Sequence, residues 1–277
     1  MATEADLDRR GGRPVERTRV VRLRDGRASE APDVLATEEP LEIRLEGQQV
    51  AVTMRTPGHD AELSVGFLIG EGIVHPGDVA QATECRSEEG DGGVVDVRLR
   101  PGRRPSAGWQ RNFYASSSCG VCGKASIEAV RVAAPAVPDG PHVQPSILSE
   151  LPDRMRAAQR VFDRTGGLHA AGIFTPEGDL ELVREDVGRH NAVDKVVGRS
   201  ALDGRLPLNE RVLLVSGRTS FEVVQKAVVA GVPIVAAVSA PSSLAVRLAE
   251  DANMTLVGFL RPSGFNVYAG RERVAAP

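Results

Sequence analysis

Two cysteines in a run of small residues are the side chains of this sequence best suited to covalent chemistry. Cys119 and Cys122 lie within residues 116–124, where the other residues are three serines, two glycines, a valine and a lysine. Small neighbours leave a thiol accessible, and the positive charge of Lys124 favours the nucleophilic thiolate. Cys85 is the remaining cysteine, so the chain lacks the second pair that a four-thiolate zinc site or a disulfide framework needs. The pair is therefore predicted to be reactive rather than structural.

Composition and charge exclude several classes of protein. The chain has 277 residues, of which 42% are hydrophobic and 26% charged, as in globular proteins, and a net charge of -3 favours neither nucleic acid nor an anionic membrane. No apolar run approaches the roughly 20 residues of a spanning helix, and no secretory signal follows the charged N-terminus. Three free-looking cysteines suit a reducing compartment. We expect a cytoplasmic protein that binds no nucleic acid and no membrane.

The first third of the chain predicts a tail and a small α+β domain. Residues 1–32 are charged and lack a hydrophobic period, which predicts a largely disordered or extended tail. Within residues 33–108, alternation over 41–54 predicts a hairpin, an apolar stretch from Ala61 to Ile69 predicts a helix, and 82–86 and 94–99 predict two further strands. A linker is expected at 101–108, where proline, glycine and arginine are frequent.

Residues 109–277 predict a larger α/β domain. Helical spacing from Leu151 to Phe162 ends at Gly166, and a hairpin is expected over 168–184. The stretch 211–260 then alternates strand, helix, strand, helix and strand, with Thr219 and Glu222 at the spacing of a capping box. Such a run predicts a partly parallel sheet covered by helices.

Three loops of this run are candidates for ligand binding. They cover 216–219, 239–243 and 261–264, and each follows a predicted strand. Ligands collect at the carboxyl ends of parallel strands, and small hydroxylated loops with arginine suit phosphate groups. Serine, threonine and glycine are also ordinary cap and turn residues, so a purely structural role stays open.

A dense polar stretch at 185–197 is a second candidate. Acidic residues followed by Gly188, Arg189, His190 and Asn191 at a helix start would gather hydrogen-bonding groups around one opening. Its apolar residues share one helical face, so a solvated helix explains it equally well. His169 is likewise either a ligand or a satisfied structural residue.

Taken in order, these segments resemble the FdhD family of formate dehydrogenase accessory sulfurtransferases. The resemblance covers roughly residues 34–268. The segments that carry it are Ser117-Ser118-Cys119-Gly120-Val121-Cys122-Gly123-Lys124, Thr165-Gly166-Gly167-Leu168-His169-Ala170-Ala171, Glu185-Asp186-Val187-Gly188-Arg189-His190-Asn191-Ala192-Val193-Asp194-Lys195, Ser216-Gly217-Arg218, Ser239-Ala240-Pro241 and Gly258-Phe259. Each segment alone is weak, whereas the ordered set is specific.

The resemblance implies a fold, a function and a set of site residues. The fold would be a cytidine-deaminase-like three-layer α/β domain beside the smaller N-terminal α+β domain, in a homodimer. The function would be a sulfurtransferase that takes sulfur from a cysteine desulfurase as a persulfide and passes it to the molybdenum or tungsten bis-guanine-dinucleotide cofactor of formate dehydrogenase. Cys119 would carry the persulfide and Cys122 assist. The cofactor-binding residues would be Phe259, Leu260, Arg261, Pro262, Ser263, Gly264, Ser216, Arg218, Ser239 and His190.

The implied fold comes without the chemistry of zinc deaminases. Those enzymes need His-x-Glu and Pro-Cys-x-x-Cys. Here Ala170 and Ala171 follow His169, and Ser118 precedes Cys119, so we expect neither deamination nor a resident metal.

Three other functions are compatible with two cysteines at this spacing. A thioredoxin-like oxidoreductase would place them between a strand and a long helix in a shorter chain. A zinc module would combine them with two histidines. A scaffold would bind the cofactor without transferring sulfur. The first is disfavoured by the serine- and glycine-rich surroundings of Cys119 and Cys122.

Overall fold

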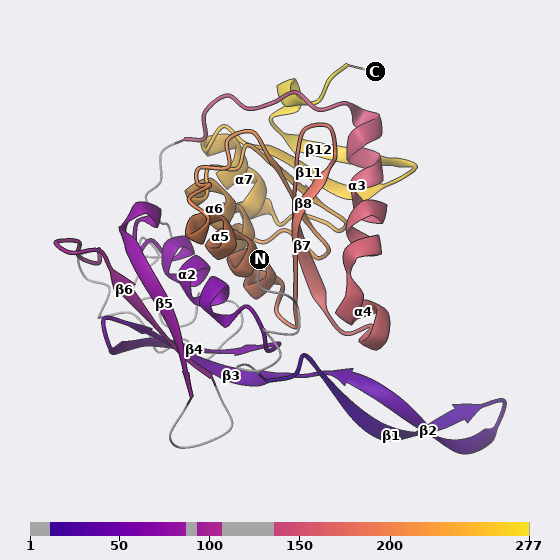
Figure 1. Cartoon of the computed structure of the whole chain (residues 1–277). Helices are drawn as coiled ribbons and strands as arrows, with labels where there is room; N and C mark the ends of the chain where they lie inside the picture. Colours follow the sequence, from indigo (N-terminus) through magenta and orange to yellow (C-terminus); the bar gives the residue numbers. More distant parts are fainter. Residues whose placement is uncertain (1–11, 87–92, 107–135, 277) are drawn as a thin grey trace.

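The computed structural model describes residues 12–86, 93–106 and 136–276. A C-terminal sheet carries α3 on one face and α5, α6 and α7 on the other (Figure 1). Helix α2 packs against α5 and α6 from outside, and a smaller sheet covers α2. The predicted α/β class, with a three-layer domain and a smaller α+β unit, is confirmed.

The larger sheet is mixed. Its strands are β7 (His169–Phe174), β8 (Leu180–Asp186), β9 (Val212–Val215), β10 (Ile234–Ala237), β11 (Thr255–Arg261) and β12 (Gly264–Ala269), in the order β12-β11-β10-β9-β7-β8. Strands β9, β10 and β11 are parallel, as the alternating run predicts, and an antiparallel hairpin lies at each end of the sheet. The sequence did not predict β12, because only the short turn after Arg261 separates it from β11.

The helices begin and end close to the predicted residues. They are α3 (Pro145–Ala158), α4 (Arg160–Thr165), α5 (Arg189–Leu202), α6 (Phe221–Val229) and α7 (Ser243–Asp251), with short 3-10 turns at Pro76–Asp78 and Arg271–Arg273. The helix predicted from Leu151 to Phe162 is divided at Gln159, whose ψ of 78 is not helical. Gly166 ends α4 in the left-handed region, where glycine has no Cβ penalty. Among the described helices, none is long and apolar enough to cross a membrane.

The smaller unit is a four-stranded sheet with one helix. Its elements are β3 (Glu39–Leu45), β4 (Gln48–Arg55), α2 (Asp60–Gly70), β5 (Val79–Arg86) and β6 (Gly93–Leu99), with the strand order β4-β3-β6-β5. The predicted hairpin, helix and two later strands are all present. Alternation works here because one face of each strand is buried and the other faces solvent.

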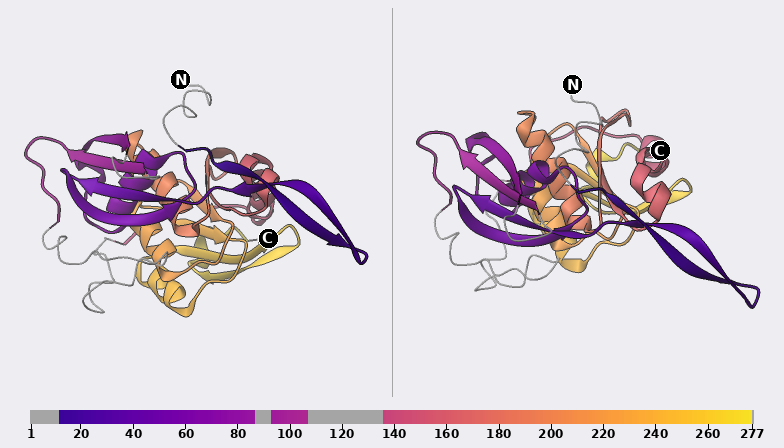
Figure 2. Two further views of the ribbon diagram at one scale, coloured as in Figure 1. Left: turned by 90° about the horizontal axis from the view of Figure 1, so that it is seen from below. Right: turned by 60° about the horizontal axis from the view of Figure 1, so that its bottom comes forward.

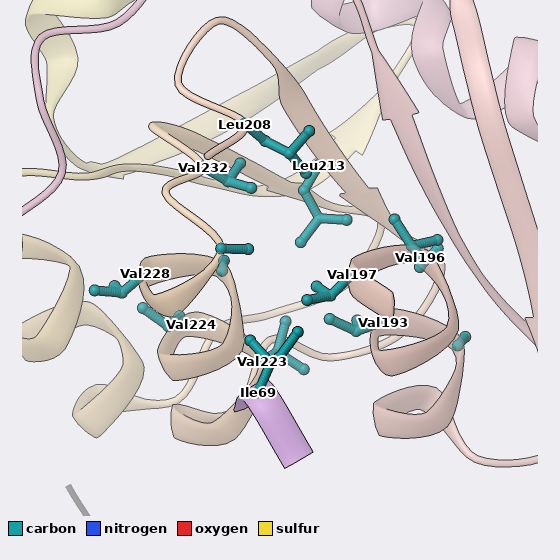
Figure 3. Close-up of a cluster of buried hydrophobic side chains, with 14 of the residues drawn as sticks. Ile69, Val193, Val196, Val197, Leu208, Leu213, Val223, Val224, Val228 and Val232 are labelled. Carbon is teal, nitrogen blue, oxygen red and sulfur yellow. The ribbon is translucent and has the colours of Figure 1, made fainter. Parts of the chain in front are cut away.

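One hydrophobic core joins the two units. It includes Leu41 and Val95 of the smaller sheet. Ile69 of α2, Val193 of α5 and Val223 of α6 belong to the same core (Figure 3). A second core lies between α3 and the opposite face of the larger sheet. The division near residue 108 therefore separates two sheets that share apolar packing, rather than two independent cores.

Residues 12–32 differ from the predicted disordered or extended tail, and residues 1–11 lie outside the described residues. Strands β1 (Val15–Arg24) and β2 (Arg27–Ala36) form a regular antiparallel hairpin that projects from the body (Figures 1 and 2). Its turn is Asp25-Gly26, with both residues at positive φ, as a two-residue hairpin turn requires. The many charges of the two strands conceal their β pattern, because most of these side chains are exposed on both faces.

Helices α2 and α5 approach so closely that glycine is required at the contact. A Cβ atom on Gly198 would lie 1.8 Å from the carbonyl oxygen of Glu62, and one on Gly66 would lie 1.8 Å from that of Asp194. Both obstacles are backbone atoms, which cannot move without separating the helices. This contact fixes α2 of the smaller unit against α5 of the larger unit.

We predict that Gly198→Ala lowers the free energy of unfolding by about 3 kcal/mol, because overpacking against backbone forces the helices apart. Urea unfolding followed by circular dichroism measures the change. Gly167→Ala is the matched control, since its added Cβ would meet Ala36 at an ordinary 3.7 Å. Equal effects of the two substitutions would contradict the tight-contact explanation.

Candidate functional site

Polar loops from five strands meet at one edge of the larger sheet. Strands β9, β10 and β11 end there because they are parallel. Strand β7 runs the opposite way and begins there with His169, which pairs with Asp186 at the end of β8. The predicted grouping of three loops at the carboxyl ends of strands is therefore confirmed. Helices α5, α6 and α7 begin at the same edge, each immediately after one of these strands.

Backbone hydrogen bonds hold these loops in fixed positions. Ser216 Oγ accepts from the amide of Ala170 at 2.9 Å, which ties the loop after β9 to β7. The amide of Thr219 donates to Ala240 at 3.2 Å, and the amide of Ser242 donates back to Thr219 at 3.0 Å. The carbonyl oxygen of Ser239 accepts from the amide of Phe259 at 3.2 Å, so Ser216 and Ser239 both make structural bonds, whereas Arg218 is exposed to solvent.

His190 joins the starts of α5 and α6. Its Nε2 lies 2.9 Å from Ser220 Oγ and 3.0 Å from Glu222 Oε2, and the ring is 7% exposed. Ser220, not Thr219, is the N-cap of α6, and its side chain makes no capping bond. The predicted capping box is therefore wrong, because His190 contacts the side chains of both Ser220 and Glu222. Since one ring nitrogen contacts both partners, the three residues do not form a Ser-His-Glu catalytic triad.

Glu222 is the most perturbed acid of this edge. Burial raises its pKa to about 7, opposed by the positive charge of Lys226 and reinforced by Glu71. Its Oε1 atom is buried and has no hydrogen-bond partner among the residues that the structure describes. A carboxyl with a pKa near neutrality can bind or release a proton at physiological pH. The sequence pattern predicts only a capping role for Glu222, since its burial follows from the packing of α5 on α6.

Arg189 lies at the β7 end of this edge, beside the loop after β9. A Cβ atom placed on Gly217 would lie 3.5 Å from Arg189 Cδ and 3.4 Å from His169 Nδ1. Burial and the charge of Arg189 lower the pKa of His169, which favours its neutral form. Arg189 Nε is buried without a hydrogen-bond partner within the described parts of the chain. A guanidinium beside the free amides of two helix N-termini is an arrangement that binds phosphate.

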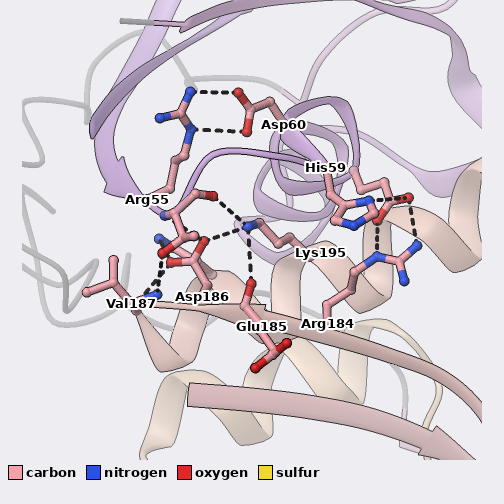
Figure 4. Close-up of polar contacts among 12 residues, drawn as sticks. Arg55, His59, Asp60, Arg184, Glu185, Asp186, Val187 and Lys195 are labelled. Atoms are coloured by element: carbon pink, nitrogen blue, oxygen red, sulfur yellow. Dashed lines mark hydrogen bonds and ion pairs between the residues drawn. The ribbon is translucent and has the colours of Figure 1, made fainter. Parts of the chain in front are cut away.

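Most of the polar stretch 185–197 is structural. The carboxylate of Asp186 contacts Lys195 Nζ at 2.7 Å and accepts from the amide of Thr56 at 3.2 Å and from Asn191 Nδ2 at 2.9 Å (Figure 4). Lys195 also donates to the carbonyl of Thr56 at 2.9 Å, and Asn191 to that of Met54 at 2.8 Å. These bonds attach the end of β4 to the start of α5. Of the predicted site residues here, Arg189 and His190 contribute to the edge.

Two further ion pairs join α5 to α6 and β8 to α2. Asp194 of α5 contacts Lys226 of α6 at 2.7 Å, and both are buried. Arg184 of β8 holds Glu62 of α2 in a two-bond pair of 2.6 and 2.9 Å. Burial alone would raise the pKa of Glu62, but hydrogen bonds from His59 and Arg184 outweigh it and lower that pKa to about 2. The carboxylate therefore stays charged across the neutral range.

Segment 259–264 forms the tip of the β11–β12 hairpin. Phe259 has a positive φ of 53 and is 46% exposed, so it is not merely the last core residue of its strand. Leu260 is fully buried in the core under α3, which takes its side chain away from the exposed surface. Arg261 donates to the carbonyl oxygens of Val238 and Leu260. Pro262, Ser263 and Gly264 lie at the exposed turn.

The predicted sulfur site lies elsewhere in the chain. Cys119 and Cys122 are outside the described residues. Cys85 is an exposed free thiol on β5, and its Sγ donates to the carbonyl oxygen of Thr83 at 4.0 Å. Within residues 12–86, 93–106 and 136–276, no three histidine, cysteine, aspartate or glutamate side chains are grouped for a metal ion.

Comparison with known proteins identifies the family. The model of the FdhD/NarQ family matches residues 36–275, and the chain belongs to this family. A protein of Streptomyces avermitilis named sulfur carrier protein FdhD is 58% identical, with 95% of this chain and 97% of that protein covered. A protein of the same name from Mycobacterium tuberculosis is 53% identical over 88% and 92%. The resemblance seen in the sequence is thus confirmed.

A solved structure supports both family and fold. The crystal structure of a protein from Desulfotalea psychrophila, described as a putative formate dehydrogenase accessory protein, superimposes with a TM-score of 0.73. It is 25% identical, and the alignment covers 94% of this chain and 99% of that one. Membership of this family excludes the thioredoxin-like alternative, as does the six-stranded sheet formed by the described residues.

We predict that Glu222→Gln becomes relatively more stabilising as pH rises. The pKa of Glu222 is about 7 in the folded protein and about 4.5 in the unfolded chain, so the cost of ionising it grows between these two values. From pH 5 to pH 8, the unfolding free energy of the variant should gain about 2 kcal/mol relative to wild type. Urea unfolding at both pH values measures this. A pH-independent difference would show that Glu222 is ionised throughout.

Proposed function

We propose that this protein carries sulfur for the maturation of formate dehydrogenase. The observation that supports this most directly is its close similarity, over nearly the whole chain, to relatives named sulfur carrier proteins. In this proposal a cysteine desulfurase donates the sulfur in the cytoplasm, and the acceptor is the molybdenum or tungsten bis-guanine-dinucleotide cofactor. The cofactor is cargo, so the protein needs one place for sulfur and one for the nucleotide.

The sulfur step is a thiol exchange at Cys119. Its thiolate attacks the outer sulfur of the desulfurase persulfide, forming Cys119–S–SH and releasing the desulfurase thiolate. Cys122 then attacks the Cys119 sulfur, forming a disulfide and releasing hydrosulfide to the metal. The transferred sulfur is reduced by the two thiols, and a cellular thiol reductant must restore them. In this division Cys119 is the carrier and Cys122 the assisting thiol.

The nucleotide would lie along the polar edge of the larger sheet. Neighbouring strands are about 4.8 Å apart, so the three steps from β7 to β11 span about 14 Å. That length accommodates a nucleoside diphosphate, with Phe259 against the purine at one end and Arg189 on the phosphates at the other. Arg261 is less suited to phosphate because it already donates to two carbonyl oxygens. The loops between these two ends contain Ser216, Arg218 and Ser239. His190 lies beside them at the start of α5.

We predict that Cys119 gains one sulfur atom during incubation with a cysteine desulfurase and cysteine. Intact-mass spectrometry should show the added mass, its loss on reduction, and its absence in Cys119→Ser. Cys85→Ser is the matched control, because Cys85 is an exposed free thiol on β5. If only Cys122→Ser failed to gain the sulfur atom, Cys122 would be the carrier and Cys119 the assisting thiol. Stoichiometric zinc in the purified protein would support the zinc module instead, and maturation of formate dehydrogenase by Cys119→Ala would support a scaffold.

We predict that GDP binds at the sheet edge and that Phe259→Ala and Arg189→Ala each weaken it about tenfold, the value expected for one charge-assisted bond or one lost stacking contact. Titration calorimetry measures the affinity. Guanosine should respond to Phe259→Ala and not to Arg189→Ala, because it lacks the phosphates. Arg247→Ala on the exposed face of α7 is the control. Unchanged GDP affinity in both test variants would place the nucleotide elsewhere.

A further inference from the structure

Neither the sulfur step nor the nucleotide site described above gives a role to His169. It is the first residue of β7 and is half-buried at the polar edge of the larger sheet. No hydrogen bond joins its ring to another residue among those that the structure describes. A histidine with a structural role is normally held by a hydrogen bond to one of its ring nitrogens. The ring of His169 is therefore available to bind a ligand.

The strand register places His169 beside an open position. Strand β7 pairs Ala171 with Val215 of β9, so two residues further along the edge His169 lies opposite Gly217. A Cβ atom on Gly217 would lie 3.4 Å from His169 Nδ1 and 3.5 Å from Arg189 Cδ. Because both atoms are this close to one point, they are less than about 7 Å apart, a separation that one phosphate group can bridge with two hydrogen bonds.

Two charged residues act on the ring. Burial and the positive charge of Arg189, from the start of α5, lower the pKa of His169, and Asp186 of β8 opposes them. The carboxylate of Asp186 is itself paired with Lys195 at 2.7 Å, so part of its charge is already compensated. In the free protein His169 is therefore neutral near pH 7.

The remaining charged groups of the neighbouring elements have other contacts. Glu185 of β8 accepts from the amides of Val161 and Phe162 at 3.0 and 2.8 Å, at the start of α4. Glu222 of α6 contacts His190 at 3.0 Å. From the loop after β9, Arg218 is exposed to solvent. The charge nearest to the open position is thus that of Arg189.

A bound phosphate would reverse the effect of Arg189 on His169. Its negative charge would compensate the guanidinium, and a negative charge beside a histidine favours the protonated ring. The protonated ring would then donate a charge-assisted hydrogen bond, which is roughly twice as strong as a neutral one. The edge would carry one positive charge here when it is empty and two when it is occupied.

We propose that His169 and Arg189 hold one phosphate of the nucleotide between them over Gly217, and that His169 takes up a proton when this phosphate binds. The assignment rests on the nucleotide site proposed above and adds a binding residue to it. The proton comes from solvent and returns to it on release. Phosphate affinity is then greatest when the free ring can be protonated, and it falls as pH rises through the higher pKa of the bound ring.

Titration calorimetry at two pH values tests the proton uptake. The probe is diguanosine pyrophosphate, because both of its phosphates are diesters, as in a dinucleotide cofactor, and do not titrate between pH 6 and pH 8. Wild type should bind it about tenfold more tightly at pH 6 than at pH 8, the effect of one unit in the pKa of one group. At pH 7, buffers of different ionisation enthalpy should reveal protons taken up by the complex. His169→Gln keeps a hydrogen-bond donor that cannot be charged and should remove both effects, whereas His142→Gln, at an exposed histidine, should retain both.

Three results would overturn the proposal. Proton uptake that persists in His169→Gln and disappears in Glu222→Gln would place the proton on Glu222, whose pKa the charge of Arg189 also lowers. Binding that depends on Phe259 and Arg189 but takes up no proton would leave the nucleotide site in place and remove His169 from it. Absence of any binding would contradict the nucleotide site and the role of His169 together.

A methyl group at Gly217 tests the geometry. The backbone of Gly217 is outside the left-handed region, and the added Cβ would meet His169 and Arg189 at ordinary contact distances, so Gly217→Ala should fold normally. The methyl group would occupy the position assigned to the phosphate and should weaken binding of diguanosine pyrophosphate about tenfold, the value for one lost charge-assisted bond. Guanosine, which has no phosphate, should bind as it does to wild type. Equal affinity of Gly217→Ala and wild type for diguanosine pyrophosphate would place the phosphate elsewhere.

Discussion

The buried ion pair between Asp186 and Lys195 determines where the site residues lie. It connects the end of β8 with the first turns of α5, and its hydrogen bonds to Thr56 bring the end of β4 to the same place. Arg189 and His190 follow Asp186 after only Val187 and Gly188, so their positions at the sheet edge depend on it. Burying two charges costs desolvation, which the pair offsets only because the remaining carboxylate oxygens accept hydrogen bonds. The ion pair therefore determines the positions of these residues more than it stabilises the fold.

The sequence predicted the arrangement of strands better than the roles of polar residues. Three parallel strands followed from apolar runs separated by helix signals, and parallel direction alone placed the three loops at one edge. The stretch from Glu185 to Lys195 was ambiguous because its partners, Met54 and Thr56, are 130 to 139 residues away. Long-range contacts of this kind leave no local period. Because its contact with His190 is also long-range, the sequence predicts only a capping role for Glu222.

The elements that the sequence did not predict are those in which a turn or a long-range contact matters more than the local hydrophobic pattern. Charged residues on both faces concealed the β1–β2 hairpin, and only Asp25-Gly26 marked its turn. At 261–264, the sequence predicts a loop after the strand but not the next strand, and the chain reverses there into β12. Leu260 points into the α3 core as a result, because neighbouring residues of a strand face opposite sides. Phe259 thereby becomes the exposed aromatic of the hairpin tip.

Differences in hydrogen bonding distinguish the arginines at the sheet edge. Arg261 donates hydrogen bonds to the carbonyl oxygens of Val238 and Leu260. Binding a phosphate there would first break bonds that hold β10 to β11. Arg189 has a buried Nε without a partner among the described residues, and it lies beside His169, whose pKa is lowered. Because neutral His169 contributes no positive charge, an anion at this edge would be attracted mainly by Arg189 and the helix N-termini. Selectivity for phosphate would then depend on the helix α5 that the Asp186–Lys195 pair holds in place.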